Sequence, residues 1–401
     1  MKKNKFYEVV FTILLSLSYF IYSSAIKISY YYAIVLGILF FVFFLLAFKQ
    51  NDSVLKKDKK FTNSIIYLLI PLFIVPWSFI LVILFDNSLL FEKFLSRCLL
   101  YFITPIEAIA LYGLFKDKAI NIFFRGAILN YIFVILLFIL QNGIFQVFTT
   151  VYYSLFSSDS VKSILEAHEV TFVFGILLVY YLLNNFKNNK GKCLICFIFS
   201  LMGYKRIMLL AILFSLLYGL LSLTKLSSGK LSDKKLLFSS KIIFCIIILF
   251  FVLWLLVIKN DVLLFLSLKY DINFMGRLNI YSLISNDYIV SPFYLGKGLG
   301  YISYWGEVNS SLTNYTALHS GIIQMYVENG FVLFCLYLYN MIYLNSKRIL
   351  KINRRSVFVY LSICVYTLIC WFTDNIATYY NYLVAFSLIS ITLLNDNDKD
   401  F

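Results

Sequence analysis

Arginine is scarce in this 401-residue chain, which contains 28 lysines but only seven arginines. Each arginine is therefore informative, because a guanidinium is always charged and binds phosphate oxygens through a planar fork. Lys205 and Arg206 are adjacent in a short turn between two apolar runs, where neighbouring cations repel unless an anion joins them. With Arg97 and Arg277, they are candidate ligands for a phosphate or pyrophosphate group. The alternative is that these side chains only reach the membrane surface, and for Arg97 the two interpretations have equal weight.

The chain has only two histidines, His168 and His319, each close to the start of an apolar run. Histidine can transfer a proton near neutral pH, so His319 is our first candidate for a general base and His168 the second. The alternative role for both is a polar anchor at the end of a helix. After His319, Gln324 and Glu328 are four residues apart and would share one helix face, where they could support the site or contact a sugar.

Glycine occupies alternate positions in Gly296-Lys297-Gly298-Leu299-Gly300. This spacing permits tight turns and close approach of the backbone to a ligand, which makes Gly298 a candidate contact. It matches neither a P-loop nor a dinucleotide-binding fingerprint, so a simple flexible loop is the main alternative.

Two further patterns lie inside apolar runs. Glu107 follows Pro105 near the middle of a run; it could carry protons in a transporter or bind a partner such as a tyrosine hydroxyl. Cys193 and Cys196 have the spacing of a metal or redox pair, but no second pair accompanies them. We expect both cysteines to be buried as small apolar side chains, and we expect no metal.

The composition requires a membrane protein. Hydrophobic residues make up 61% of the chain and charged residues 14%, and the mean hydropathy is +0.85. The net charge of +15 sits in short clusters between apolar runs, as topology signals do, and this excludes nucleic acid as a partner. We expect a single transmembrane domain, 1–401, with about twelve helices, both termini in the cytoplasm and a retained first helix. The predicted spans are 7–25, 29–48, 63–85, 94–115, 126–143, 168–186, 193–203, 207–224, 242–259, 330–345, 357–372 and 376–394.

The distribution of cations sets the orientation. With a cytoplasmic N-terminus, 25 of the 35 Lys and Arg residues lie inside, in agreement with the positive-inside rule. The sizeable outer segments are then 144–167 and 260–329, and the second follows the ninth span. Arg277 opens a stretch, 278–284, with helical spacing of apolar residues, which predicts a helix on the outer surface. We therefore expect the chemistry in the outer loop 260–329.

Taken in order, these motifs resemble the Wzy-type O-antigen and capsular polysaccharide polymerases, which are related to the O-antigen ligases. The resemblance rests on Lys205-Arg206 between two helices, Gly276-Arg277 early in the outer loop, the glycine-rich segment 296–300, and His319 followed by Glu328-Asn329-Gly330. It implies an all-α C-type glycosyltransferase fold in the cytoplasmic membrane of a bacterium. His168 stands where an arginine is more readily expected, which leaves the role of that position open.

The resemblance also implies a reaction. The enzyme would join oligosaccharide repeat units linked to undecaprenyl pyrophosphate, on the outer face of the membrane, without a metal or other cofactor. Arg206 and Arg277 would bind the donor pyrophosphate, with Lys205 and Arg97 as further candidates, and His319 would accept the proton of the attacking hydroxyl. A chain-length regulator and a separate flippase would be partners.

Two rival functions stay open. A ligase that transfers finished polymer would share both fold and motifs with a polymerase. A flippase or other transporter of lipid-linked oligosaccharides would account for the span count and for Glu107, although such proteins usually have two similar halves and short loops.

Overall fold

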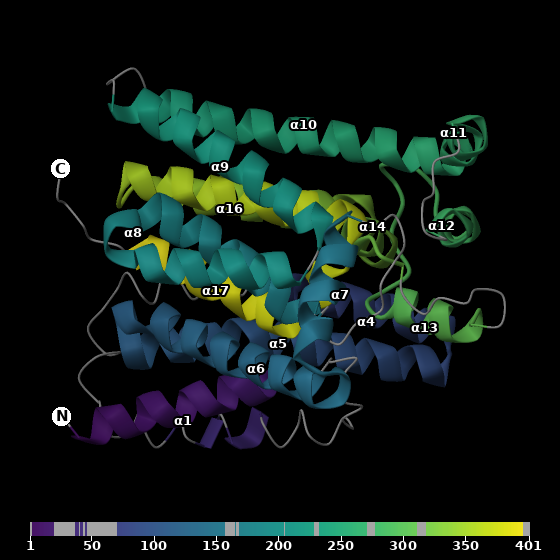
Figure 1. The fold of residues 1–401 in the computed structure, drawn as a ribbon. Coiled ribbons are helices and arrows are strands. Elements are labelled where there is room, and N and C mark those ends of the chain that lie inside the picture. Colours follow the sequence, from purple (N-terminus) through teal and green to yellow (C-terminus); the bar gives the residue numbers. More distant parts are fainter. Residues whose placement is uncertain are drawn as a thin grey trace.

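The computed structural model describes residues 2–19, 70–156, 168–203, 205–227, 232–270, 277–310 and 318–395, and isolated positions at 37–39, 41, 42, 45 and 165. Within these residues the regular structure is entirely helical, and the long helices lie side by side (Figure 1). The helices are α1 (Lys2–Ser18), α4 (Ile74–Phe85), α5 (Ser88–Phe115), α6 (Ala119–Asn142), α7 (Ile144–Phe156), α8 (His168–Met202), α9 (Arg206–Ser227), α10 (Asp233–Lys259), α11 (Val262–Tyr270), α12 (Arg277–Ser285), α13 (Tyr301–Val308), α14 (Gly321–Tyr339), α15 (Asn345–Leu350), α16 (Arg354–Thr373) and α17 (Tyr380–Asn395).

The chain is a polytopic α-helical membrane protein. Among the described residues, six helical segments are long and apolar enough to cross a bilayer: 88–142, 169–202, 206–224, 233–259, 321–350 and 354–373. The first of these contains both α5 and α6, and α4 and α17 are shorter apolar helices. Most of the predicted span 29–48 lies outside the described residues.

Helix α8 consists of two antiparallel arms. The backbone leaves helical geometry at Asn185 and Asn189, between the predicted spans 168–186 and 193–203. At one end of the pair, a Cβ added to Gly203 would lie 2.2 Å from the Thr171 side chain, so the beginning of the first arm meets the end of the second. The short seventh segment of the prediction is therefore a separate helical arm that returns along the bundle.

Lysine and arginine side chains tie the helices together at one end of the bundle. The ammonium of Lys118 bonds Glu8 at 3.0 Å, and the guanidinium of Arg355 donates to the carbonyl oxygen of Asn184 at 2.7 Å. Arg354 bonds Asp233 of α10 at 2.6 Å. Figure 1 places the start of α1 and the end of α17 at this same end, whereas α11, α12 and α13 lie at the opposite one. We call these the basic end and the loop end.

Helix α14 is broken at Gly330. Gly330 has φ +75°, a left-handed conformation that favours glycine, and it divides α14 into an arm at 321–329 and an arm at 331–339. The break frees the carbonyl groups of Val327 and Glu328, which accept hydrogen bonds from the backbone N–H groups of Lys297 and Gly298, each at 2.9 Å. The first arm starts nine residues before the predicted span at 330–345, so part of the expected loop is a buried helix.

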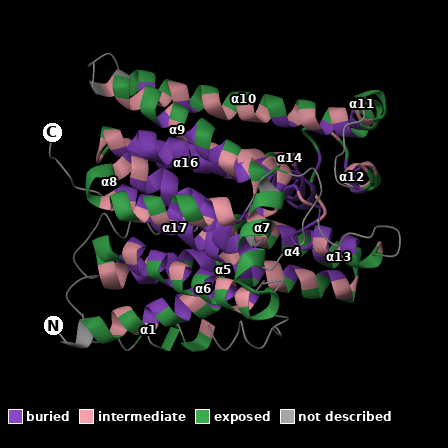
Figure 2. Cartoon of the chain, viewed as in Figure 1, coloured by how far each residue is buried: buried purple, intermediate pink, exposed green. Residues whose placement is uncertain are grey.

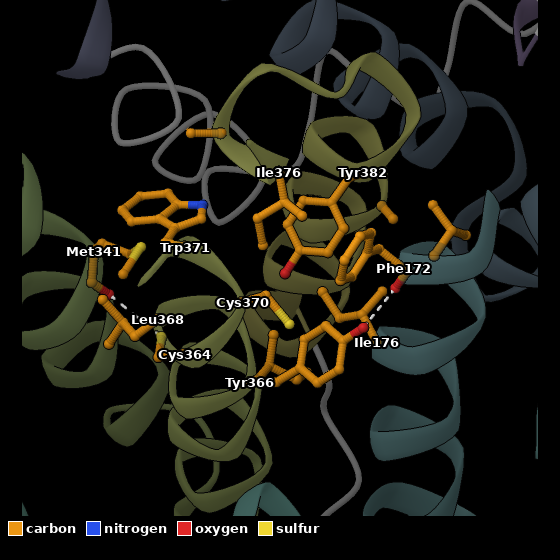
Figure 3. Packing of buried hydrophobic residues seen from close by; sticks show 14 of the residues in the cluster. Phe172, Ile176, Met341, Cys364, Tyr366, Leu368, Cys370, Trp371, Ile376 and Tyr382 are labelled. Carbon is orange, nitrogen blue, oxygen red and sulfur yellow. Dashed lines mark hydrogen bonds between the residues drawn. The ribbon is translucent and has the colours of Figure 1, made fainter. Parts of the chain in front are cut away.

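The core lies between α8, α14, α16 and α17. In Figure 3 the rings of Tyr366, Trp371 and Tyr382 fill the space between these helices, and the Tyr366 hydroxyl donates to the Phe172 carbonyl at 3.0 Å. Figure 2 shows α16 buried along most of its length and α10 exposed along much of it. Cys193 and Cys196 are buried and unbridged in the second arm of α8, and no metal-binding group of side chains occurs among the described residues.

Candidate functional site

Asp374 is the centre of a polar cluster at the loop end, immediately after α16. Its carboxylate lies 3.9 Å from the ammonium of Lys205 and accepts a hydrogen bond from the Tyr379 hydroxyl at 2.5 Å. Its backbone carbonyl accepts from Gly321 N at 2.9 Å, which fixes the start of α14. The side chain of Asp374 is only 3% exposed and that of Lys205 only 14%, so solvent screens this ion pair little. Asp374 thus joins the turn before α9 to the start of α14.

Lys205 and Arg206 form the start of α9, in the turn that the sequence predicts. The carbonyl oxygen of Lys205 accepts hydrogen bonds from Met208 N at 2.9 Å and Leu209 N at 3.2 Å, as expected of the residue that precedes a helix. Arg206 is the first helical residue and is exposed. The positive end of the α9 dipole therefore coincides with two cationic side chains, an arrangement that favours anions.

Arg277 lies near Asp374 and His319, because it shares a helix with Tyr281, which contacts both residues electrostatically or by a hydrogen bond. Both residues belong to α12, which confirms the helix predicted over 278–284. The Tyr281 hydroxyl donates to the carbonyl oxygen of His319 at 3.2 Å. Burial raises the pKa of Tyr281 to about 12, while the charge of Arg277 opposes this shift and that of Asp374 adds to it. The phenol is therefore protonated at neutral pH and lies within electrostatic reach of both charged residues.

His319 has an unusual backbone conformation. Its φ of +51° is left-handed, a region that histidine visits more readily than most residues other than glycine, asparagine and aspartate. Strain of this kind costs on the order of 1–3 kcal/mol and tends to occur at functional sites. The next residue, Ser320, caps α14 by accepting a hydrogen bond from Ile323 N at 3.5 Å. The imidazole is therefore carried on a backbone that is fixed on both sides, by Tyr281 and by the helix cap.

These contacts bring Lys205, Arg206, Arg277 and His319 to one end of the bundle, although 114 positions separate Lys205 from His319 in the sequence. We call this group, with Asp374 and Tyr281, the loop-end site. Guanidinium and ammonium groups at the start of α9 and α12 can bind the oxygens of an anion. His319, whose backbone carbonyl accepts the bond from Tyr281, carries an imidazole that can take a proton from a hydroxyl group. The site thus has the parts needed to bind a phosphorylated leaving group and to assist a nucleophile.

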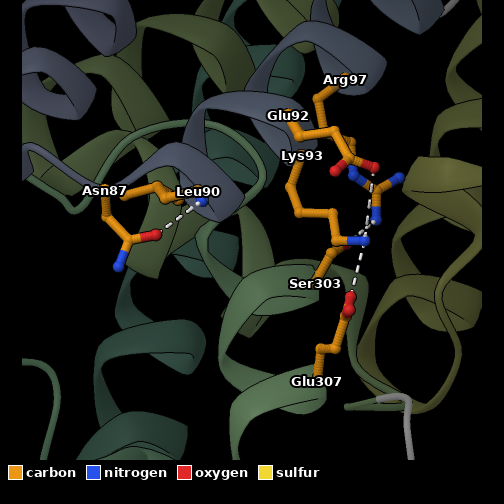
Figure 4. A network of polar contacts seen from close by, with 7 residues as sticks. All are labelled: Asn87, Leu90, Glu92, Lys93, Arg97, Ser303 and Glu307. Atoms are coloured by element: carbon orange, nitrogen blue, oxygen red, sulfur yellow. Dashed lines mark hydrogen bonds and ion pairs between the residues drawn. The ribbon is translucent and has the colours of Figure 1, made fainter.

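Arg97 belongs to a second polar cluster on the other side of the first α14 arm. It donates to the Ser303 hydroxyl at 3.0 Å (Figure 4). Its charge also acts on the Glu328 carboxylate. Glu328 Oε1 also accepts from Ile302 N at 3.3 Å, in the first turn of α13, and from the Gln324 amide at 3.1 Å. The bond between Gln324 and Glu328 confirms that they share one helix face. Arg97 and Glu328 hold α5, α13 and α14 together.

The glycine-rich segment 296–300 makes close contacts with three helices. Its glycines have φ of +91°, +91° and +86°. A Cβ added to Gly296 would lie 2.6 Å from the Glu328 carbonyl oxygen, and one added to Gly300 would lie 2.6 Å from the backbone of Lys93. A Cβ on Gly298 would lie 2.7 Å from Val82 of α4. The sequence suggests that the glycine backbone lies close to a ligand. In the structure it packs instead against α14, α5 and α4.

Glu169, which sequence reasoning passed over, binds the start of α17. Its carboxylate accepts from Tyr380 N at 3.1 Å and from the Asn381 amide at 3.0 Å. The hydroxyl of the same tyrosine donates to Glu107, so the intramembrane carboxylate has the tyrosine partner that was one of its two predicted roles. His168 begins α8 beside Glu169, but its side chain lies outside the described part of the structure.

Asp374 and Tyr281 could not be recognised as site residues from composition or spacing. The only sequence signal for Asp374 is an acid directly after an apolar run, on the side that the cation count assigns to the outside. Comparison of the chain with protein-family models, curated proteins and solved structures found no match.

Proposed function

We propose that this chain is a polysaccharide polymerase of a bacterial cytoplasmic membrane, with twelve spans, a C-type glycosyltransferase fold and its loop end facing outward. It joins undecaprenyl-pyrophosphate-linked oligosaccharide repeat units into O-antigen or capsular polysaccharide. The observation that carries the proposal is the convergence of Lys205, Arg206, Arg277 and His319 around Asp374 and Tyr281. The two cationic motifs and His319 are among those on which the sequence resemblance rests, and they come from distant segments of the chain.

The cations hold the donor. Arg206 and Arg277 bind the pyrophosphate, and Lys205 adds a third positive charge, whose strength the neighbouring Asp374 moderates. Charge develops on the pyrophosphate as it leaves, so contacts that strengthen during this step accelerate the reaction. Arg97 stays a candidate for a contact with the substrate, in addition to its bond with Ser303.

The imidazole of His319 assists the acceptor. A hydroxyl at the non-reducing end of one repeat unit attacks the anomeric carbon of the donor sugar, and its proton passes to His319. A new glycosidic C–O bond forms, and the bond from the anomeric carbon to the pyrophosphate oxygen breaks. The electron pair leaves with undecaprenyl pyrophosphate. No metal or other cofactor takes part in the proposed step.

The two rival functions differ in what they require of the chain. A ligase would use the same site and would transfer finished polymer to another acceptor. A transporter would need Glu107 to gain and lose protons, and the bond from Tyr380 favours the alternative in which Glu107 is an anchor between α5 and α17. We therefore place the polymerase first, the ligase second and the transporter third.

Deletion of the gene in its host, followed by complementation, separates these functions. For a polymerase, the deletion strain carries single repeat units on its surface, and the intact gene restores a ladder of longer chains on a gel. For a ligase, long chains persist but stay attached to the lipid carrier. For a flippase, repeat units accumulate on the cytoplasmic face, where an enzyme added outside cannot reach them.

A further inference from the structure

A cavity with both polar and apolar lining residues lies within the membrane-spanning bundle, between α5, the α14–α15 segment and α17. It offers about 70 Å³ of space to the centres of water-sized molecules. Its lining includes Thr104, Asn340, Met341, Asn345 and Ser390, and none of the residues that line it is charged. A single water molecule occupies a sphere of about 10–15 Å³, so the cavity has room for several.

Two buried amide oxygens in this lining have no hydrogen-bond partner among the described residues: Oδ1 of Asn340 and Oδ1 of Asn345. The two residues are only 4% and 7% exposed. Buried polar atoms are nearly always hydrogen-bonded in native proteins, to protein or to ordered water. Each oxygen therefore needs a donor other than the described protein groups, and ordered water is the donor that a cavity can hold.

The orientation of the Asn345 amide is fixed by its neighbours. The Tyr360 hydroxyl has one proton, which it donates to the Met341 carbonyl oxygen at 2.6 Å. Tyr360 can then only accept from Asn345, whose Nδ2 lies at 3.1 Å, so the nitrogen must face the tyrosine and the oxygen must point away from it. The hydrogen bonds of Tyr360 therefore fix Oδ1 of Asn345 as the atom without a partner among the described residues.

Two hydroxyl groups of the lining are also acceptors. Thr104 donates its hydroxyl proton to the Leu100 carbonyl at 2.9 Å, and Ser390 donates to the Phe386 carbonyl at 2.7 Å, which leaves only lone pairs on both oxygens. An occupant that satisfies the asparagine, threonine and serine oxygens must therefore donate hydrogen bonds. It must also be uncharged, because a cation would lose its hydration here without a counter-charge in the lining.

We propose that this cavity is a hydration site, in which a cluster of water molecules donates hydrogen bonds to Asn340 and Asn345. The π-helical turn at Asn340–Leu344 contributes to the site, because it positions both asparagines and Met341 on the cavity wall. Tyr101 also lines the cavity and donates to the sulfur of Met325, in the first arm of α14. The water cluster therefore adjoins the helix that carries Gln324 and Glu328. The inference does not depend on the proposed function.

Radiolytic hydroxyl-radical labelling with mass spectrometry tests the proposal on the purified full chain in nanodiscs. Radicals generated from bound water label adjacent side chains even when these are buried. Met341 on the cavity wall is 3% exposed, and Met208 in the core is 0% exposed. The two methionines are thus equally buried, but only Met341 lines the cavity. We expect Met341 to be labelled several-fold faster than Met208. Equal, slow labelling of both would overturn the proposal.

Two variants link the water to the named acceptors. Asn340→Leu removes an acceptor and fills part of the cavity, so labelling of Met341 should fall towards the rate of Met208, which should not change. Thr104→Val removes a second acceptor with little change in volume, and it provides the same readout if Asn340→Leu does not fold. Undiminished labelling of Met341 in a folded variant would contradict the assignment of the water to these side chains.

Discussion

The hydroxyl of Tyr281 donates a hydrogen bond to the carbonyl oxygen of His319, at 3.2 Å, and so joins helix α12 to the residue before the α14 cap. Tyr281 is also within reach of the Arg277 charge. The bond therefore connects Arg277, which we propose binds the pyrophosphate, to His319, which we propose is the base. The position of the imidazole is therefore coupled to the position of α12.

Substitution of His319 separates the chemistry of its imidazole from the conformation of its backbone. Asparagine and glycine both accept the left-handed φ of +51°, so His319→Asn and His319→Gly should fold and keep the bond from Tyr281. If the imidazole is the base, both variants should lose about 10²- to 10⁴-fold in polymerisation rate. Polymer ladders from cells with matched expression give the measurement. A normal ladder from His319→Asn would move the base elsewhere, with His168 the next candidate.

The arginines should respond to a change that keeps their charge. Arg206→Lys and Arg277→Lys lose the two-pronged contact with a pyrophosphate, and we expect kcat/KM to fall by about tenfold or more. Arg125→Lys is a matched control, because Arg125 is exposed at the basic end, near Glu8. Full ladders from both loop-end variants, with the control unchanged, would reduce Arg206 and Arg277 to anchors at the membrane surface.

Gly300 of the glycine-rich segment and Gly330 of α14 should be sensitive to substitution because of packing. An added Cβ at Gly330 would lie 2.4 Å from the backbone of Leu295, and one at Gly300 would lie 2.6 Å from that of Lys93; both glycines also have positive φ. Conformational strain alone costs on the order of 1–3 kcal/mol. We expect Gly300→Ala and Gly330→Ala to lower the Tm of the detergent-solubilised protein by several degrees. Gly191→Ala is the control, since a Cβ there meets no atom within 4 Å; alanine suits a helix better than glycine, so the Tm should not fall.

Glu107 distinguishes the enzyme from a proton-coupled transporter. The oxygen of a glutamine can still accept the hydrogen bond from Tyr380, but its amide cannot exchange a proton. We therefore expect Glu107→Gln to restore a full ladder in the deletion strain. Tyr380→Phe, which removes the donor instead, should lower stability, because it leaves the Glu107 carboxylate buried without this bond. Loss of all surface polysaccharide with a stably expressed Glu107→Gln would favour the transporter.

Apolar runs and cation counts predict the helices of this protein better than they predict where the helices begin. The span predicted from 242 begins at Asp233, where Ser232 caps α10, and the span predicted from 94 begins at Ser88, where Asn87 caps α5. Both caps are polar, and charged residues stand between them and the apolar runs: Asp233, Lys234 and Lys235 in α10, and Glu92 and Lys93 in α5. Hydropathy therefore does not include these first turns. For the same reason the first arm of α14, which carries Gln324 and Glu328, resembles a loop in the sequence although it is buried.

The site residues likewise divide into those that the sequence identifies and those that only the structure identifies. Arg206, Arg277 and His319 could be selected because their types are scarce and their chemistry is specific. Asp374 could not, because its importance lies in contacts with Lys205 and Gly321, from segments more than 50 residues away. The contacts of the glycine-rich segment with α4, α5 and α14 are likewise between distant segments, and spacing along the chain cannot distinguish them from contacts with a ligand.

Reconstitution of the purified protein with its lipid-linked substrate tests the central claim most directly. Repeat units extracted from the deletion strain supply both donor and acceptor, and the assay measures chain length and free undecaprenyl pyrophosphate in the same proteoliposomes. We predict a ladder from the native protein, with one undecaprenyl pyrophosphate released for each glycosidic bond formed, and neither product from His319→Asn. Folded native protein that forms no ladder, or that releases undecaprenyl pyrophosphate without lengthening the chains, would contradict the proposed polymerase.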